Sequence, residues 1–187
     1  MKSILLATAL LLMLGQTALA QETDTGDVAA NYFWEHANTT PGNCGCFGMN
    51  GGALSASAKF SNSLSGIVEF SAEQASNVLS SGKSLTITSY QAGVRFQVPQ
   101  SWRPESHRIQ PFVEAMMGAA HAGGGIAGTA DGTFAFASTL GGGVDVPVGS
   151  RLSVRVVQVD YLLTLFKNFS TGTQNNFRVG AGVVYRW

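Results

Sequence analysis

In several segments of this 187-residue chain, apolar and polar residues alternate. The charged residues at the polar positions of these segments are the groups most able to do chemistry. Five are acids and five are bases. Because the two kinds occur in equal number, they can neutralise one another as ion pairs or line a polar passage. The set is Glu35, Lys59, Glu69, Arg95, Glu114, Asp145, Arg155, Asp160, Arg178 and Arg186.

Two of these residues, Asp160 and Arg178, are predicted to lie level on adjacent strands when residues are counted from the predicted turns. Glu35 is expected to approach Arg178 from the first strand. An isolated buried ion costs several kcal/mol, so charges enclosed together must pair. Two interpretations follow: a structural plug of salt bridges, or a narrow gated pore for ions or small solutes.

Histidines and cysteines offer a second set of reactive groups. His36 and His121 lie at predicted loop edges on one end of the molecule, where a hydrolase would hold a Ser/His/acid set, but no serine stands at a characteristic spacing to either. A single glycine separates Cys44 from Cys46; an oxidising compartment favours a loop disulfide, although so short a ring is geometrically tight. Two thiols alone are an incomplete metal site, so no metal or other cofactor is expected.

The elements that position these groups alternate apolar and polar side chains with a period of two, which is typical of β-strands. The last of them has six apolar residues on one face, ending in Tyr185 and Trp187, and arginines and glycines on the other. Eight strands are predicted, at residues 28–36, 51–60, 64–73, 85–98, 108–120, 133–146, 151–163 and 176–187.

The seventh predicted strand breaks this alternation. Ser153 and Arg155 share one face, whereas Gln158 and Asp160 share the other. One extra residue reverses the phase of a strand. We therefore predict a β-bulge near residues 156–157 that returns all four polar side chains to one face.

Eight strands with short connections form an up-and-down barrel or a sandwich. The odd-numbered connections are predicted to be longer than the even-numbered ones, as in transmembrane barrels with long outer loops and short periplasmic turns. A soluble barrel of the lipocalin kind would instead turn its apolar face inward. Small residues on the charged face favour the membrane barrel, because they suit a crowded interior: Gly93, Gly118, Gly141, Gly143, Gly180 and Gly182. The predicted fold is an all-β, eight-stranded antiparallel transmembrane barrel.

The N-terminus has the pattern of a cleaved secretory signal, residues 1–20, with Lys2, a short apolar run and the small-residue site Ala18-Leu19-Ala20. A short linker, residues 21–27, then leads into a barrel domain, residues 28–187. Because the chain stops at the last predicted strand, no further domain is expected. Charged residues are 12% of the chain and balance to zero, which excludes nucleic acid as a partner because that would require a basic patch.

The C-terminal strand resembles that of bacterial outer-membrane barrels, in which a glycine and two aromatics, here Gly182, Tyr185 and Trp187, form the signal read by the barrel assembly machinery. With the glycine-rich residues 50–52 and 141–145 and the segment 155–161, this strand makes the chain similar to the outer-membrane protein A-like transmembrane β-barrel superfamily. The resemblance covers nearly all of the sequence after the signal. It implies integral insertion into the bacterial outer membrane, contact with outer-membrane lipid, and insertion by that machinery.

Three functions are compatible with these patterns. The principal expectation is a non-enzymatic structural or surface-interaction role, in which the outer loops bind an unknown extracellular ligand around a charge-plugged interior. The first alternative is a narrow gated pore. The second is an outer-leaflet lipid hydrolase using His36 or His121. Conductance separates the first alternative from the others, and lipid turnover separates the second.

Overall fold

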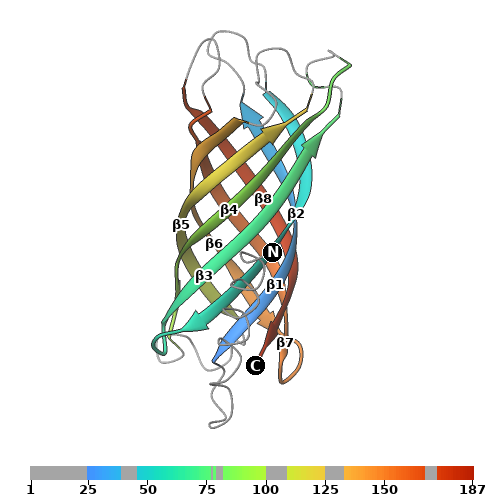
Figure 1. Ribbon diagram of the computed structural model, residues 1–187. Coiled ribbons are helices and arrows are strands. Elements are labelled where there is room, and N and C mark those ends of the chain that lie inside the picture. Colours follow the sequence, from blue (N-terminus) through green and yellow to red (C-terminus); the bar gives the residue numbers. More distant parts are fainter. Residues whose placement is uncertain are drawn as a thin grey trace, which may run out of the picture.

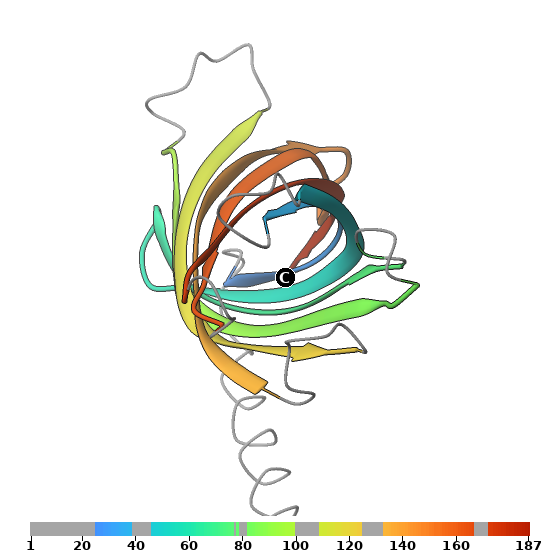
Figure 2. The same ribbon diagram turned by 90° about the horizontal axis from the view of Figure 1, so that it is seen from above.

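In this computed structural model the described residues are 25–38, 46–76, 78, 82–99, 109–124, 133–166 and 172–187. They form eight antiparallel strands in sequence order, and pairing of the last strand with the first closes the barrel (Figure 1 and Figure 2). This confirms the predicted fold. Within these ranges no helix is long and apolar enough to cross a membrane. The strands are β1 (Gly26–Asn38), β2 (Cys46–Lys59), β3 (Leu64–Ala75), β4 (Leu85–Gln97), β5 (Gln110–Gly123), β6 (Thr133–Pro147), β7 (Leu152–Thr164) and β8 (Gln174–Arg186).

Several strands extend beyond their predicted ends. β1 continues to Asn38, which pairs with Cys46 at the start of β2, so the first connection shrinks to residues 39–45. β1 also begins at Gly26, so Gly26 and Asp27 belong to the sheet and not to the linker in which the sequence placed them. Polar residues continue these strands because the main-chain groups of a barrel must find partners on neighbouring strands.

The bulge predicted in β7 is present. The register of β7 against β8 shifts between Arg155 and Gln158, and against β6 it passes from Val157 to Arg155 with Val156 left over. Arg155 and Gln158 are fully buried, whereas Val156 and Val157 are exposed on the outer face. The extra residue therefore returns the polar side chains of β7 to the interior.

The two faces of the barrel wall differ as the alternation of the sequence predicted, with the apolar face outward and the polar face inward. Outward side chains are large and apolar: Leu54, Met117 and Leu140 are each more than 60% exposed. Inward side chains are mainly polar, and Ser71, Gln158 and Arg178 are among the fully buried ones. An apolar exterior around a polar interior is the arrangement of a transmembrane barrel.

Inward-facing glycines make the space that large interior side chains occupy. A Cβ atom on Gly180 would lie 2.5 Å from Cδ1 of Phe33, and one on Gly143 would lie 2.8 Å from Cζ of Phe112. Both distances are too short for carbon atoms, so each aromatic ring occupies the place of a missing methyl group. The small residues predicted to suit a crowded interior thus have specific neighbours.

We expect Gly180→Ala to destabilise the barrel by about 1–3 kcal/mol, the usual cost of overpacking. The new methyl group would overlap the ring of Phe33 and the carbonyl oxygen of Tyr32. Denaturant unfolding of the protein refolded in lipid vesicles measures the change. Gly123→Ala is the matched control, because the atom nearest to its new Cβ, Cε1 of His121, would be 3.8 Å away. Equal losses in the two variants would show that interior space is not the cause.

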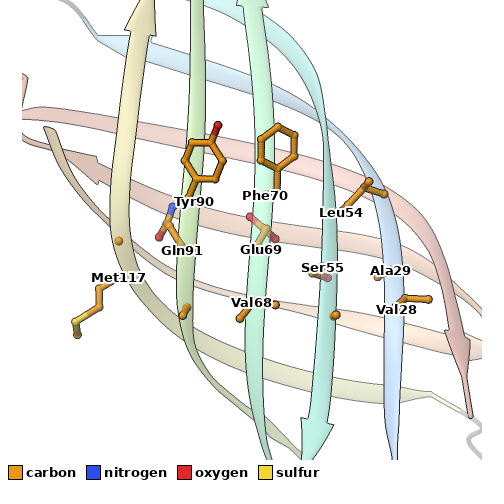
Figure 3. Close-up of a pocket in the computed structure, with 13 residues that line it drawn as sticks. Val28, Ala29, Leu54, Ser55, Val68, Glu69, Phe70, Tyr90, Gln91 and Met117 are labelled. Carbon is orange, nitrogen blue, oxygen red and sulfur yellow. The ribbon is translucent and has the colours of Figure 1, made fainter. Parts of the chain in front are cut away.

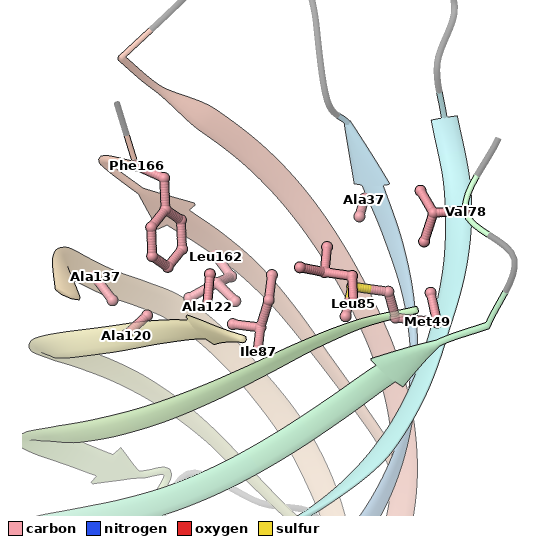
Figure 4. Packing of buried hydrophobic residues seen from close by; sticks show 11 residues of the cluster. Ala37, Met49, Val78, Leu85, Ile87, Ala120, Ala122, Ala137, Leu162 and Phe166 are labelled. Atoms are coloured by element: carbon pink, nitrogen blue, oxygen red, sulfur yellow. The ribbon is translucent and has the colours of Figure 1, made fainter. Parts of the chain in front are cut away.

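The barrel interior also contains an apolar layer at the end that carries the odd-numbered connections (Figure 4). Met49 and Leu162 in this layer are fully buried. Because apolar side chains gain by leaving water, their packing stabilises this end of the barrel. We call these residues the apolar cluster: Ala37, Met49, Ala75, Val78, Leu85, Ile87, Ala120, Ala122, Ala137, Leu162 and Phe166.

Candidate functional site: the charged interior

Below this layer the interior holds a set of charged side chains, which among the described residues come from every strand except β2; smaller polar side chains and the rings of Phe33 and Phe112 lie among them. Among the described residues, seven carboxylates and four guanidinium groups are buried there, none more than 7% exposed. Because the carboxylates outnumber the arginines, individual arginines serve several of them. The carboxylates are Asp27, Glu35, Glu69, Glu73, Glu114, Asp145 and Asp160, and the arginines are Arg95, Arg155, Arg178 and Arg186.

Arg178 of β8 is the most highly connected of these groups. Its Nε donates to Asp160 at 2.8 Å, its Nη2 to Glu69 at 2.5 Å and its Nη1 to Glu73 at 3.2 Å. Its guanidinium carbon also lies 4.4 Å from the centroid of the Phe33 ring, in the geometry of a cation–π contact. One arginine thus ties β8 to its neighbour β7 and, across the lumen, to β3.

Arg95 of β4 forms a second centre. Its Nε donates to Glu114 at 2.8 Å and its Nη1 to Asp27 at 3.3 Å. The guanidinium groups of Arg95 and Arg155 both lie against the Phe112 ring, 4.7 and 4.4 Å from its centroid. The electron-rich face of an aromatic ring attracts cations, so Phe112 stabilises both arginines.

Asp145 of β6 joins a third group near the short-turn end. Arg155 binds both of its carboxylate oxygens, at 2.8 and 3.2 Å. Arg186 lies 3.4 Å from the same carboxylate and donates a second hydrogen bond to Ser153. A two-pronged arginine–carboxylate pair fixes orientation as well as charge.

The amide of Gln158 connects these centres. Its Nε2 donates to Glu114 at 2.8 Å and to Asp160 at 3.0 Å, while its Oε1 accepts from Arg155 at 2.9 Å. Gln158 therefore links the Arg178 group to the Arg95 and Arg155 groups. Sequence reasoning missed this role because it considered charged residues, although Gln158 lies on the polar face of the strand.

Nine of the ten residues proposed from the sequence as a charge network are buried in the interior. Lys59, the tenth, is the last residue of β2 and half-buried, and it forms no ion pair within the described part of the chain. Glu35 faces Arg178 in register, yet neither of its carboxylate oxygens has a hydrogen-bond partner among the described residues. Asp160 and Arg178 face each other in register and are paired directly.

Two carboxylates of the interior were missed by the sequence analysis. Asp27 was assigned to the linker, although it lies on the same parity as Asn31 and Glu35. Glu73 was placed at the end of a strand whose polar parity it shares with Glu69. In both cases parity was the available signal: extending the first strand by one residue would have identified Asp27, and applying the alternation to the last residue of the third predicted strand would have identified Glu73.

His36 and His121 lie on the outer surface and not in the interior. The ring centroid of His36 is 5.9 Å from that of Trp34, and the ring centroid of His121 is 4.8 Å from that of Phe134. In the described ranges no serine hydroxyl is hydrogen-bonded to either imidazole. These positions do not bring together the Ser/His/acid arrangement that a hydrolase would need.

The remaining predicted sites are only partly covered by the described residues. Cys44 lies outside them, so the predicted loop disulfide with Cys46 lies outside them as well. No group of three or more His, Cys, Asp or Glu residues that could hold a metal ion occurs in the described ranges. At the C-terminus, Tyr185 and Trp187 are exposed on the outer face, whereas Gly182 packs inward beneath Asn31.

A closed eight-stranded antiparallel barrel with an apolar outer wall and buried salt bridges inside is the architecture of a small bacterial outer-membrane protein. A comparison with curated proteins found no match. The chain belongs to the outer membrane protein beta-barrel domain family, whose model matches residues 6–186. It is therefore an integral outer-membrane barrel, in contact with membrane lipid.

Three solved structures share this fold at low sequence identity. Neisserial surface protein A is 13% identical with a TM-score of 0.68, over 87% of this chain and 97% of that one. The attachment invasion locus protein Ail of Yersinia pestis, in complex with the heparin analogue sucrose octasulfate, is 12% identical with a TM-score of 0.54, over 87% and 99%. The N-terminal barrel of Pseudomonas aeruginosa OprF is 14% identical with a TM-score of 0.51, over 88% and 100%.

Proposed function

We propose that this protein is a non-enzymatic, non-conducting barrel that acts at the cell surface, where its rigid wall presents the outer connections to an extracellular partner. The observation that carries the proposal is the filling of the interior. Eight strands enclose a space just wide enough for side chains to fill. Such a barrel can conduct ions only if its side chains leave this interior space open.

Two kinds of barrier follow one another along the barrel axis. Arg155 and Arg178 are fully buried in the charged part, each held by at least one carboxylate. At the outer end the apolar cluster contributes Met49 and Leu162, which are fully buried as well. An ion crossing the barrel would have to displace paired charges and then leave water at an apolar layer, and both steps are unfavourable.

We infer that recognition uses the four connections at the outer end, residues 39–45, 76–84, 124–132 and 165–173. Their sequences contain three charged residues, Lys83, Asp131 and Lys167. Binding of a polyanion generally needs several cationic side chains close together. The complex of Ail with a heparin analogue therefore does not carry over to this chain, and the composition supports a partner recognised by hydrogen bonds and apolar contacts.

We expect the refolded barrel to give no conductance steps in planar bilayers and to release no fatty acid from outer-membrane lipid. The filled interior accounts for the first result and the separated histidines for the second. An open porin and a lipid hydrolase, refolded in the same way, serve as positive controls. Discrete conductance steps would instead support the narrow pore, and lipid turnover abolished by His121→Ala would support the hydrolase.

A further inference from the structure

Three polar side chains on neighbouring strands form a row on the inner face of the barrel wall. Ser55 of β2 pairs in register with Glu69 of β3, and Glu69 pairs with Gln91 of β4. All three residues are at most 5% exposed. Figure 3 shows them on adjacent strands. We call these three residues the interior row.

The interior row contains polar atoms that have no hydrogen-bond partner among the described residues. These atoms are Oγ of Ser55, Oε2 of Glu69 and both Oε1 and Nε2 of Gln91. Gly93 on the same strand as Gln91, and Gly118, its register partner on β5, have no side chain that could bond to the amide. A buried polar group without a partner is costly, so three of them in one row indicate a bound species.

The excess negative charge of the interior lies beside this row. Toward the short turns, carboxylates and arginines are equal in number: Arg95 binds Asp27 and Glu114, and Asp145 binds Arg155 and Arg186. Around Arg178 one guanidinium faces four carboxylates, of which Glu69, Glu73 and Asp160 bind it and Glu35 lies opposite it in register. Glu69 belongs to both this group and the interior row. A cation bound at the row would therefore offset part of the excess.

We propose that the interior row binds a calcium ion through Glu69, Gln91 and Ser55. Carboxylate, amide carbonyl and hydroxyl oxygens are the ligands that hard cations prefer, whereas Zn²⁺ favours sites that include histidine or cysteine. Mg²⁺ demands a nearly regular octahedron. Ca²⁺ accepts about six to eight oxygens in flexible geometry, and water supplies those that the protein does not.

Glu69 can bind the ion without losing its salt bridge. Its Oε1 accepts a hydrogen bond from Nη2 of Arg178 at 2.5 Å, and Oε2 is the unpaired atom. One carboxylate thus serves the arginine and the ion with different oxygens. Because only one ligand is acidic, the site differs from the clusters of three or more His, Cys, Asp or Glu residues that the described ranges lack. The proposal goes beyond the surface role and does not depend on it.

The test is calcium binding by the full chain, refolded with Ca²⁺ or with EDTA in phosphatidylcholine vesicles, which carry no net charge. Equilibrium dialysis with radioactive calcium should find one tightly held ion per barrel. Ca²⁺ should also raise the urea concentration that unfolds the protein, because a ligand of the folded state stabilises that state. Gln91→Leu removes the amide at similar size and should weaken binding by about tenfold or more. Ser55→Ala tests the same row if Gln91→Leu does not fold.

Thr139→Val is the matched control. Thr139 is also buried and its hydroxyl has no partner among the described residues, but its register partners are the apolar Met116 and Leu162. This variant should bind calcium as tightly as the unaltered protein. Each protein must first show the gel shift between unheated and boiled samples that marks a folded barrel.

Binding that is weakened in the variants of the interior row and kept in Thr139→Val supports the proposal. Equal binding by all the proteins, equal weakening in the control, or no calcium on the folded unaltered protein would overturn it. Unfolding that depends on pH but not on Ca²⁺ would assign the excess charge to bound protons and would overturn it too.

Discussion

Arg178→Gln is expected to lower the free energy of unfolding by about 3–5 kcal/mol, the range observed when one partner of a buried ion pair is removed. The arginine serves Glu69, Glu73 and Asp160, and all of these groups are at most 1% exposed at their side chains. Without it, three carboxylates remain buried with their main counter-charge gone. Denaturant unfolding in lipid vesicles measures the loss.

A double-mutant cycle shows whether the loss comes from this pairing. Asp160→Asn together with Arg178→Gln should cost less than the sum of the two single changes, because the double variant removes a charge of each sign. Arg151→Gln is the control, since Arg151 is exposed at the β6–β7 turn and should change stability little. Strictly additive losses would mean that Asp160 and Arg178 do not depend on each other energetically.

Leu140→Arg is expected to destabilise the inserted barrel by about 2–4 kcal/mol, the cost of a cation on the lipid face near the bilayer midplane. Leu140 is 65% exposed on the outer wall and lies midway along β6. In water such an exposed leucine would tolerate an arginine well. The penalty arises because the solvent at this height is hydrocarbon, which does not hydrate the charge.

Val148→Arg provides the comparison for this prediction. Val148 is 59% exposed, but it lies in the β6–β7 turn outside the strands, where the new arginine can reach water. Its cost should be within a few tenths of a kcal/mol, as for ordinary surface substitutions. Similar costs for the two variants would contradict the assignment of the outer wall to lipid.

The eight strands, the two faces of the wall and the bulge could all be predicted from the sequence. Successive side chains of a strand point to opposite sides, so the face of a residue follows from its neighbours along the chain. The break between Arg155 and Gln158 was visible for the same reason, because an extra residue changes a local phase. Most buried carboxylates and arginines were identified in this way, since alternation alone places them inward.

Which of those charges contact one another could not be predicted from the sequence. Arg178 reaches Glu69 and Glu73 across the lumen, over separations of 109 and 105 residues, and no strand periodicity encodes that choice. It depends on the register of all the strands and on the diameter of the closed barrel. The apolar cluster and the linking role of Gln158 were unforeseen for the same reason: a contact across the lumen joins residues that only barrel closure brings together.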